Sequence, residues 1–389
     1  MEIKQVSNLV NLATQEALGQ TDLTVAEDLS NVVDIGNALF DANSIDAYVK
    51  SLINHIGRVI VVNRSYQGKL PSLLREGWEF GSVLEKISIG IPSSDTNESW
   101  ELEDGAVYEN SQFYKPVVTA KFFNKMETYE IDMSITEKQV KQSFTTAEQL
   151  NAFVSAIFNA INNSMEVKVE QLERRLLNNM IGETIHNEYG SALLSSKSGV
   201  RAVNLLYEYN TLVNTGADLT IDNCMHNPDF IRYCVYKIGL TIDRMSELST
   251  LFNIDGQPRF TPADRLNGAV LSEFVRDAEV YLYNAQNQLR DDYIRLADLD
   301  KLAFWQGSGT TFSFADTSKI NIKTTSGDSV STSGILACVY DRDALMVCNK
   351  EQRIKSFYVP KAEFTNYFYK YDVAQYADTS ENFVVFFIA

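Results

Sequence analysis

The side chains that could carry acid–base or metal chemistry are few and scattered along this 389-residue chain. His55, His186 and His226 are the only histidines, and no HExxH or other metal-ligand spacing connects them. Each is expected at the surface or in an interface. Residues 341–343 (DRD) place two carboxylates around an arginine, a pattern that favours an exposed ion pair with that or a nearby cation over acid–base catalysis. We therefore predict no catalytic residue, no metal site and no cofactor.

Two loops superficially resemble ligand-binding motifs, but each lacks the residues that the ligand requires. Residues 307–311 (GSGTT) have the glycines of a phosphate loop, yet no Walker lysine and no strand-to-helix transition follow. Residues 253–256 (NIDG) resemble part of a calcium loop, but the chelating glutamate and the frame of that loop are missing. No GxSxG, GxGxxG or kinase motif is present either. The sequence thus offers no reactive constellation on which an enzyme could be built.

The composition is that of a folded, acidic protein. Hydrophobic residues make up 45% and charged residues 22%, so a sizeable core can form in two or three domains. The formal net charge is -17, and such a chain repels phosphate backbones on average. Sequence-directed binding of nucleic acid through a basic face is therefore not expected. A protein that lines a DNA-filled container without adhering to the DNA would tolerate this balance, and so would many cytosolic proteins, so the charge alone does not decide between them.

Cysteine usage and targeting signals point to the cytoplasm. Cys224, Cys234, Cys338 and Cys348 form no CxxC pair, and their spacing suits neither a zinc site nor a disulfide framework. Reduced, mostly buried thiols are expected. No basic segment followed by an apolar one starts the chain, and no apolar run approaches the roughly 20 residues that cross a bilayer. We expect a soluble product with no membrane partner.

Alternating apolar residues predict a long protruding hairpin. Ile87, Ile89 and Ile91 alternate with small residues, and residues 116–123 (PVVTAKFF) are β-branched and aromatic. The acidic stretch between these strands has no helical periodicity and forms a long tip. A ribbon of two strands is marginally stable alone, so it requires a partner surface. Further strands are predicted at 58–63 and 129–135, and residues 1–57 predict an arm of short helices without an independent core.

One very long helix is predicted to start after Thr145 and Thr146, with Glu148 and Gln149 placed as in a capping box. It runs for roughly 35 to 40 residues, or about 55 to 60 Å. Residues 162–164 (NNS) are poor helix formers and mark a bend. A coiled coil or two stacked helices are the alternatives from periodicity alone. Seven apolar residues are predicted to form the buried side of this helix: Leu150, Val154, Ile157, Ile161, Met165, Leu172 and Leu176.

The second half of the chain predicts an α+β domain inserted in a β-rich frame. Pro228 begins an amphipathic helix, and residues 277–340 have the pattern of short strands and turns. The last 45 residues return to strand, ending in 383–388 (FVVFFI), which must be covered on both faces. The strands before the long helix and that helix itself are the expected cover. The eight aromatic residues within 357–376 fit either a core or contacts between subunits.

Two stretches carry a resemblance to a known family. Residues 125–171 (KMETYEIDMSITEKQVKQSFTTAEQLNAFVSAIFNAINNSMEVKVEQ) combine a strand with the start of the long helix. Residues 341–387 (DRDALMVCNKEQRIKSFYVPKAEFTNYFYKYDVAQYADTSENFVVFF) form the return strands. With the hairpin and inserted domain, this order resembles the major capsid proteins of tailed bacteriophages with the Hong Kong 97-like fold. It is most similar to those of small short-tailed phages of Gram-positive bacteria.

The resemblance implies a role for each segment of this α+β fold. Residues 1–57 would be an N-terminal arm, and 58–199 a peripheral domain with an extended loop (64–122) and a spine helix (146–188). Residues 200–340 would form the axial domain around the five- and six-fold axes, and 341–389 would return to the peripheral domain. Contacts of the loop with a neighbouring subunit would involve these residues: Ile87, Ile89, Ile91, Trp100, Tyr108 and Phe113.

The resemblance also implies partners. The chain would assemble with itself into the pentamers and hexamers of an icosahedral head, enclosing double-stranded DNA non-specifically in the virion after assembly in the host cytoplasm. A separate scaffolding protein is expected, since the chain begins at Met1 and shows no cleaved segment, together with portal and head–tail proteins. No immunoglobulin-like extra domain and no lysine–asparagine cross-link are expected. An encapsulin-like nanocompartment shell and an acidic oligomeric enzyme or binding protein remain alternatives.

Overall fold

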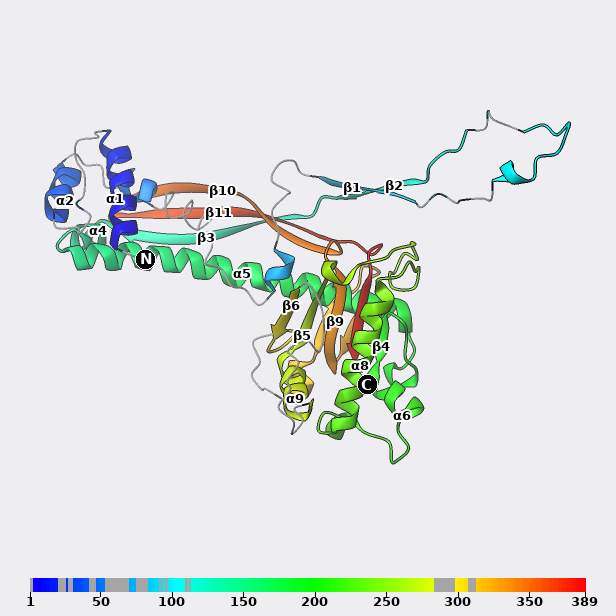
Figure 1. The fold of residues 1–389 in the computed structure, drawn as a ribbon. Helices are drawn as coiled ribbons and strands as arrows, with labels where there is room; N and C mark the ends of the chain where they lie inside the picture. Colours follow the sequence, from blue (N-terminus) through cyan, green and yellow to red (C-terminus); the bar gives the residue numbers. More distant parts are fainter. Residues whose placement is uncertain are drawn as a thin grey trace. The chain divides into compact units, whose positions relative to one another are not determined.

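The structure of the chain is a computed structural model that describes residues 3–19, 26, 31–41, 47–52, 70–74, 83–90, 92, 94, 97–108, 111, 113–282, 298–306 and 313–389 (Figure 1). The predicted strand at 58–63, His55, Ile91 and the loop at 307–311 lie outside these residues. The chain forms two compact units. The first contains Met1–Phe80, Met126–Arg175 and Val347–Ala374. The second contains Gly81–Lys125, Leu176–Met346 and Gln375–Ala389.

A three-stranded antiparallel sheet organises the first unit. Strand β11 (Phe364–Ala377) lies between β10 (Leu345–Val359) and β3 (Met126–Thr136), the strand predicted at 129–135. Alternate residues of β3 and β11 turn to opposite faces, as the pleat of a strand requires. Tyr367, Tyr369 and Tyr371 are buried, whereas Phe357 is exposed. The aromatic stretch therefore contributes mainly to the core on β11.

The long helix α5 (Ala147–Tyr189) has 43 residues, a little more than predicted. Thr146 Oγ1 accepts a hydrogen bond from Gln149 N at 3.2 Å, which satisfies one of the free donors at the helix start. The helix continues through 162–164, where Asn162 Nδ2 donates to Glu166 Oε1 at 2.7 Å. The alternative of two stacked helices is therefore wrong. All seven apolar residues predicted for its buried side are buried.

Short helices are present at the N-terminus, as the sequence predicts. Helices α1 (Ile3–Leu18) and α2 (Val32–Asp41) and the helical residues 47–52 bury apolar residues within their own unit. The ring of Tyr48 lies 5.5 Å from that of Phe144, which follows helix α4 (Glu137–Ser143). These apolar residues are therefore covered within the subunit, and the role of residues 1–57 as an N-terminal arm stays a prediction.

The start of the predicted extended loop also changes. Residues 70–74 contain a 3-10 turn (Pro71–Leu73), and Leu70 and Leu73 are fully buried. Leu74 forms a parallel bridge with Val347 of β10. These residues belong to the first unit rather than to an extended loop that begins at residue 64.

A five-stranded sheet forms the core of the second unit, in the order β4 (Ala202–Asn204), β12 (Phe383–Phe387), β9 (Ile335–Asp341), β5 (Leu266–Leu271), β6 (Asp298–Leu302). All five residues of β12 are buried, as predicted for the terminal strand. Its strand partners are β4 and β9 rather than the strands before α5. The assignment of this strand to the peripheral return strands is therefore corrected, since a fully apolar strand is stable only inside a sheet covered on both faces.

Helices surround this sheet: α6 (Leu205–Leu212), α7 (Ile221–Cys224), α8 (Pro228–Met245), α9 (Ser272–Leu282) and α10 (Phe314–Thr317). Helix α8 starts at Pro228 as predicted, with Asn227 as its N-cap. Helix α9 covers the first residues of 277–340, which were expected to be strands and turns. The hairpin of β7 (Ile320–Lys323) and β8 (Ser329–Thr332) lies against the end of α5, where Glu183 accepts hydrogen bonds from Thr325.

Candidate functional site: the ribbon and its root

Strands β1 (Leu84–Ile89) and β2 (Val118–Phe123) form an antiparallel sheet of two strands, here called the ribbon (Figure 1). Their register pairs Leu84 with Phe123 and Ile89 with Val118. Beyond the strands the chain continues through residues 90–117, with a 3-10 turn at Glu98–Trp100. The sequence prediction of a hairpin with a long tip is thus confirmed; β1 starts at Leu84 rather than at Ile87, and β2 starts at Val118 rather than at Pro116.

The ribbon has an inverted distribution of apolar residues. Its outer face carries four exposed apolar residues, Ile87, Ile89, Val118 and Phe122, together with Glu85 and Ala120; Ile87 is 60% and Phe122 64% exposed. Its other face, here called the root face, contains Leu84, Lys86, Ser88, Thr119, Lys121 and Phe123, and its two lysines pair with carboxylates of the same subunit. A strand of an ordinary two-layer fold directs its apolar face to the core and its polar face to water. In the ribbon, the lysines of the root face bind carboxylates of the same subunit, whereas the apolar residues of the outer face are exposed.

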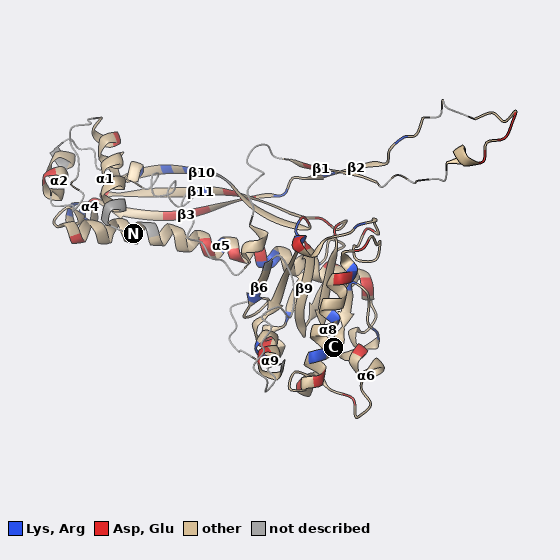
Figure 2. Cartoon of the chain, in the orientation of Figure 1, with Lys and Arg blue, Asp and Glu red and all other residues tan. Residues whose placement is uncertain are grey.

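The tip of the ribbon is apolar and acidic. Trp100 is 95% exposed, Phe113 is exposed and Tyr108 is more than a third exposed. The backbone N–H of Glu103 donates to the Tyr108 hydroxyl at 3.0 Å, which gives the tip local order. Acidic side chains lie between these apolar ones (Figure 2): Glu101, Glu103 and Asp104. Of the six predicted loop residues, the five in the described part of the chain are therefore exposed.

A cluster of ion pairs, here called the root cluster, attaches the ribbon to the rest of its unit. Lys86 Nζ lies 2.7 Å from Asp378 Oδ2 and 2.8 Å from Glu381 Oε1. Lys121 Nζ lies 2.8 Å from Asp378 Oδ1 and 2.6 Å from Asp255 Oδ2. Asp378 therefore bonds both lysines, one with each carboxylate oxygen. These charge-assisted hydrogen bonds are among the stronger ones in proteins.

The electrostatics of the root cluster follow from this geometry. Burial alone would raise the pKa of the Asp378 carboxyl, but hydrogen bonds from Lys121, Lys86 and Ser380 lower that pKa well below its ordinary range. Burial alone would lower the pKa of Lys86 and of Lys121, yet their carboxylate partners raise both pKa values. These pKa shifts favour the charged forms of Asp378, Lys86 and Lys121. That is the behaviour of a structural ion-pair network rather than of a general acid or base.

An apolar contact supports the ion pairs. The rings of Phe123 and Tyr376 stack with centroids 4.8 Å apart and an interplanar angle of 25°. Gln375 N donates to Lys125 O at 3.1 Å. The base of the ribbon is therefore attached through a ring contact, a backbone hydrogen bond and ion pairs.

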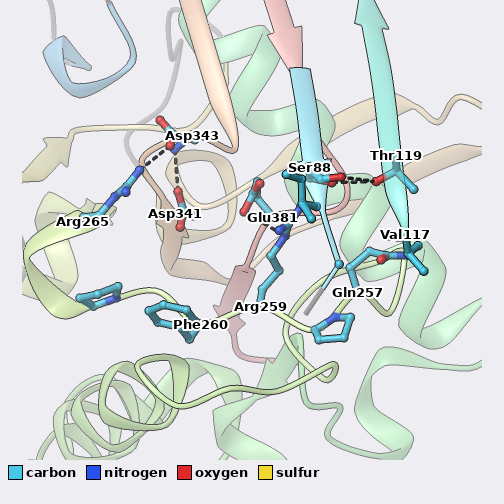
Figure 3. Close-up of a pocket in the computed structure, with 14 residues that line it drawn as sticks. Ser88, Val117, Thr119, Gln257, Arg259, Phe260, Arg265, Asp341, Asp343 and Glu381 are labelled. Carbon is cyan, nitrogen blue, oxygen red and sulfur yellow. Dashed lines mark hydrogen bonds and ion pairs between the residues drawn. The ribbon is translucent and has the colours of Figure 1, made fainter. Parts of the chain in front are cut away.

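A cavity of about 380 Å³ lies beside the root cluster, between the ribbon and the segment 257–265 (Figure 3). Its charged groups already have partners: Arg265 pairs with Asp343 at 2.5 Å, and Arg259 lies 3.6 Å from Glu381. Asp341 is buried and accepts a hydrogen bond from Thr261 Oγ1 at 2.6 Å. The DRD stretch is therefore confirmed as an ion-pair site at Asp343, whereas Asp341 has a buried structural role.

The remaining candidate groups also have structural roles. His186 Nε2 lies 3.3 Å from Asp328 Oδ2, and His226 is exposed. The loop at 253–256 supplies Asp255 to the root cluster. In the part of the chain that the structure describes, no group of three His, Cys, Asp or Glu side chains could hold a metal ion. Within the same residues, no helix has the length and hydropathy of a membrane span.

The root cluster was not predicted from the sequence. Lys86 and Lys121 alternate with the apolar residues of the ribbon, which is a local signal of a second face. Asp378 lies far along the chain, and no local pattern connects it to either lysine. Only the fold brings the three together.

Comparison with known proteins identifies the kind of molecule that carries this ribbon. The family of Phi29-like phage major capsid proteins matches residues 10–387, nearly the whole chain. The chain belongs to this family. The major capsid protein of Bacillus phage B103 is 21% identical over 366 residues, which cover 94% of this chain and 68% of that protein. The major capsid protein of Bacillus phage GA-1 is 25% identical over 161 residues, covering 40% of this chain and 33% of its own length.

The fold agrees with membership of the Phi29-like capsid family. The capsid structure of Staphylococcus phage Andhra covers 81% of this chain and 83% of its own, with a TM-score of 0.50 and 11% identity. The Hong Kong 97-like fold expected from the sequence is thereby confirmed. The chain is a phage major capsid protein, a structural component of the virion. The family match supports neither of the two alternatives, an encapsulin-like compartment or an acidic enzyme.

Proposed function

We propose that this capsid protein closes its shell by laying the ribbon and its tip over a neighbouring copy of the same chain. The observation that carries the proposal is the inverted ribbon: the root face binds the subunit's own carboxylates, and the outer face exposes Ile87 and Phe122. Exposed apolar surface of this extent marks a binding surface. In a self-assembling shell, the surface available at every position is another copy.

In this proposal one sequence forms the pentamers and hexamers of an icosahedral head. Contacts that repeat head to tail and close generate rings. The spine helix α5 and the sheet of β3, β11 and β10 serve as the peripheral domain, and the five-stranded sheet with α6 to α9 serves as the axial domain around the ring axes. Strand β12 belongs to the axial sheet. Many modest contacts, summed over the shell, resist the pressure of the enclosed DNA.

The proposed partners follow from the same role. The chain encloses double-stranded DNA non-specifically, and its net charge of -17 limits adhesion to the packaged phosphates. A separate scaffolding protein guides assembly in the host cytoplasm, and portal and head–tail proteins complete the head. The chain has a structural role and catalyses no reaction.

Deletion of residues 93–112 tests the proposal. This deletion removes the tip but retains both strands and the root cluster, so the subunit is expected to fold or to form single capsomers. Electron microscopy of the expressed protein, with its neighbouring phage genes, is expected to show no closed shells. Normal shells from this variant would refute the assignment.

Point variants separate a loss of contact from a loss of folding. Two substitutions remove exposed side chains from the tip: Trp100→Ser and Phe113→Ser. The free energy of unfolding of the subunit, measured by thermal denaturation, is expected to change by less than about 0.5 kcal/mol in each. The yield of shells is expected to fall. Leu193→Ser is the matched control, because Leu193 is an exposed apolar residue outside the ribbon. Equal shell yields from all three variants would count against the ribbon as the contact.

A further inference from the structure

The root face of the ribbon places two like charges directly opposite each other. Lys86 and Lys121 are cross-strand partners in the register of β1 and β2. Like charges at opposed positions destabilise a strand pair. A ribbon of two strands has little other support, since it is marginally stable alone. Something else must offset this repulsion.

The Asp378 carboxylate supplies the opposing charge at that point. It bonds Lys86 through Oδ2 at 2.7 Å and Lys121 through Oδ1 at 2.8 Å, and its side chain is only 1% exposed. Each lysine also has a second carboxylate partner: Glu381 binds Lys86, and Asp255 binds Lys121. Arg259 lies 3.6 Å from Glu381. Among the described residues of the root cluster, Asp378 is the one that contacts both lysines. It therefore connects the two strands at this point, next to the direct hydrogen bond between the Ser88 and Thr119 hydroxyls at 2.7 Å.

The position of Asp378 is itself fixed by the surrounding turn. Its backbone N–H donates to Ala344 O at 2.8 Å. Its Oδ1 also accepts from Ser380 N at 3.0 Å and from Ser380 Oγ at 2.7 Å. These hydrogen bonds restrict the orientation of the Asp378 carboxylate. The two lysines, and with them the two strands, are therefore held at a fixed place.

We infer that Asp378 is an electrostatic latch: it holds the two strands of the ribbon together at their root and fixes the direction in which the ribbon leaves its own subunit. This inference rests on the proposed function, in which the ribbon must reach a defined place on a neighbour. Asp378 is a positioning residue and need not touch the neighbour. Pre-ordering the ribbon lowers the entropic cost that assembly would otherwise meet in each contact.

Hydrogen exchange of the purified, unassembled subunit tests the latch. In Asp378→Asn the two lysines face each other without the carboxylate between them. Exchange of the amides in 84–89 and 118–123 is expected to accelerate about tenfold or more, while exchange in the buried strand β9 stays unchanged. The yield of closed shells from Asp378→Asn is also expected to fall. Glu279→Gln, which breaks an exposed pair with Arg276 on α9, is the matched control and leaves both readouts unchanged.

A double variant separates charge from packing. Adding Lys121→Gln to Asp378→Asn removes one of the opposed charges, so exchange in the ribbon is expected to slow again toward the wild-type rate. If the double variant exchanges as fast as Asp378→Asn or faster, or if Asp378→Asn does not accelerate exchange, the latch is refuted. Exchange reports on the latch even without shells, whereas deletion of 93–112 reports on the ribbon as the contact. The failure of one is therefore distinguishable from the failure of the other.

Discussion

Gly334 lies against the carbonyl oxygen of Ile388, so that a Cβ added at Gly334 would come within 2.1 Å of that oxygen. The two residues also share a backbone hydrogen bond, from Ile388 N to Gly334 O at 2.9 Å. Gly334 has a φ of +85°, in the left-handed region. The turn before β9 is thus built around the end of the chain, which follows β12 directly. This contact adds to the pairing of β12 with β4 and β9, which places the strand in the five-stranded sheet.

Replacing Gly334 with alanine is expected to destabilise the protein by more than about 3 kcal/mol. The left-handed backbone costs an alanine about 1–2 kcal/mol, and the added methyl group overlaps a backbone oxygen that cannot turn away. Gly327→Ala is the control, because Gly327 has a φ of +94° but open space around it. It is expected to cost about 1–2 kcal/mol. Chemical denaturation of the unassembled subunit measures both, and equal losses would show that the contact with Ile388 has no effect.

The spine helix predicts a contrast between two of its own positions. Ile161→Ala removes a fully buried side chain and is expected to cost about 2–5 kcal/mol. Val167→Ala changes an exposed position of the same helix, so a change within about 0.5 kcal/mol is expected. Thermal or denaturant unfolding compares them. Similar losses at both positions would mean that the helix is not packed on the face that contains Ile161.

The root cluster predicts a pH dependence with two limits. The pKa of Asp378 is lowered in the folded state, so its contribution is complete above about pH 4 and decreases as the pH falls through the folded value. The pKa values of Lys86 and Lys121 are raised, so their contribution is complete below about pH 10 and decreases as the pH rises through the folded values. The cluster is therefore expected to stabilise the ribbon between these limits.

The difference in unfolding free energy between the wild type and Asp378→Asn measures this contribution. Breaking a buried ion pair by removing one partner costs about 3–5 kcal/mol, and the partial exposure of both lysines reduces this to about 2 kcal/mol. The difference is expected to stay constant from pH 5 to 9 and to shrink on acidification below about pH 4. A difference that instead grows on acidification would contradict the charged state assigned to Asp378.

The burial of the four cysteines predicts that the native protein reacts slowly with thiol reagents. All four are buried and unpaired with one another. Burial raises the pKa of Cys224 to about 12 and raises the pKa values of Cys234 and Cys338, so little thiolate is present near neutral pH. A thiol reagent at pH 8 is expected to label the native subunit slowly and to label all four thiols after denaturation. Rapid labelling of the native subunit would show that at least one thiol is accessible.

Local periodicity determined much of this fold. Apolar residues at helical spacing from Leu150 to Leu176 predicted a helix that the structure confirms. Alternation predicted β1 and β3, and β-branched and aromatic residues predicted β2. Both patterns arise from the geometry of one element, so neighbouring residues contain the whole signal. The family resemblance rested on the order of these elements, and the match over residues 10–387 bears it out.

Tertiary structure decided which surfaces meet. The sequence showed that the ribbon has two faces, but only the fold turned Lys86 and Lys121 toward Asp378 and left Ile87 uncovered. It also paired β12 with β4 and β9 and covered the N-terminal helices within their own unit. Such pairings join segments that lie far apart in the chain, and their stability depends on the shape and charge of both partners. A local pattern contains only one of the two, and so it cannot select the other.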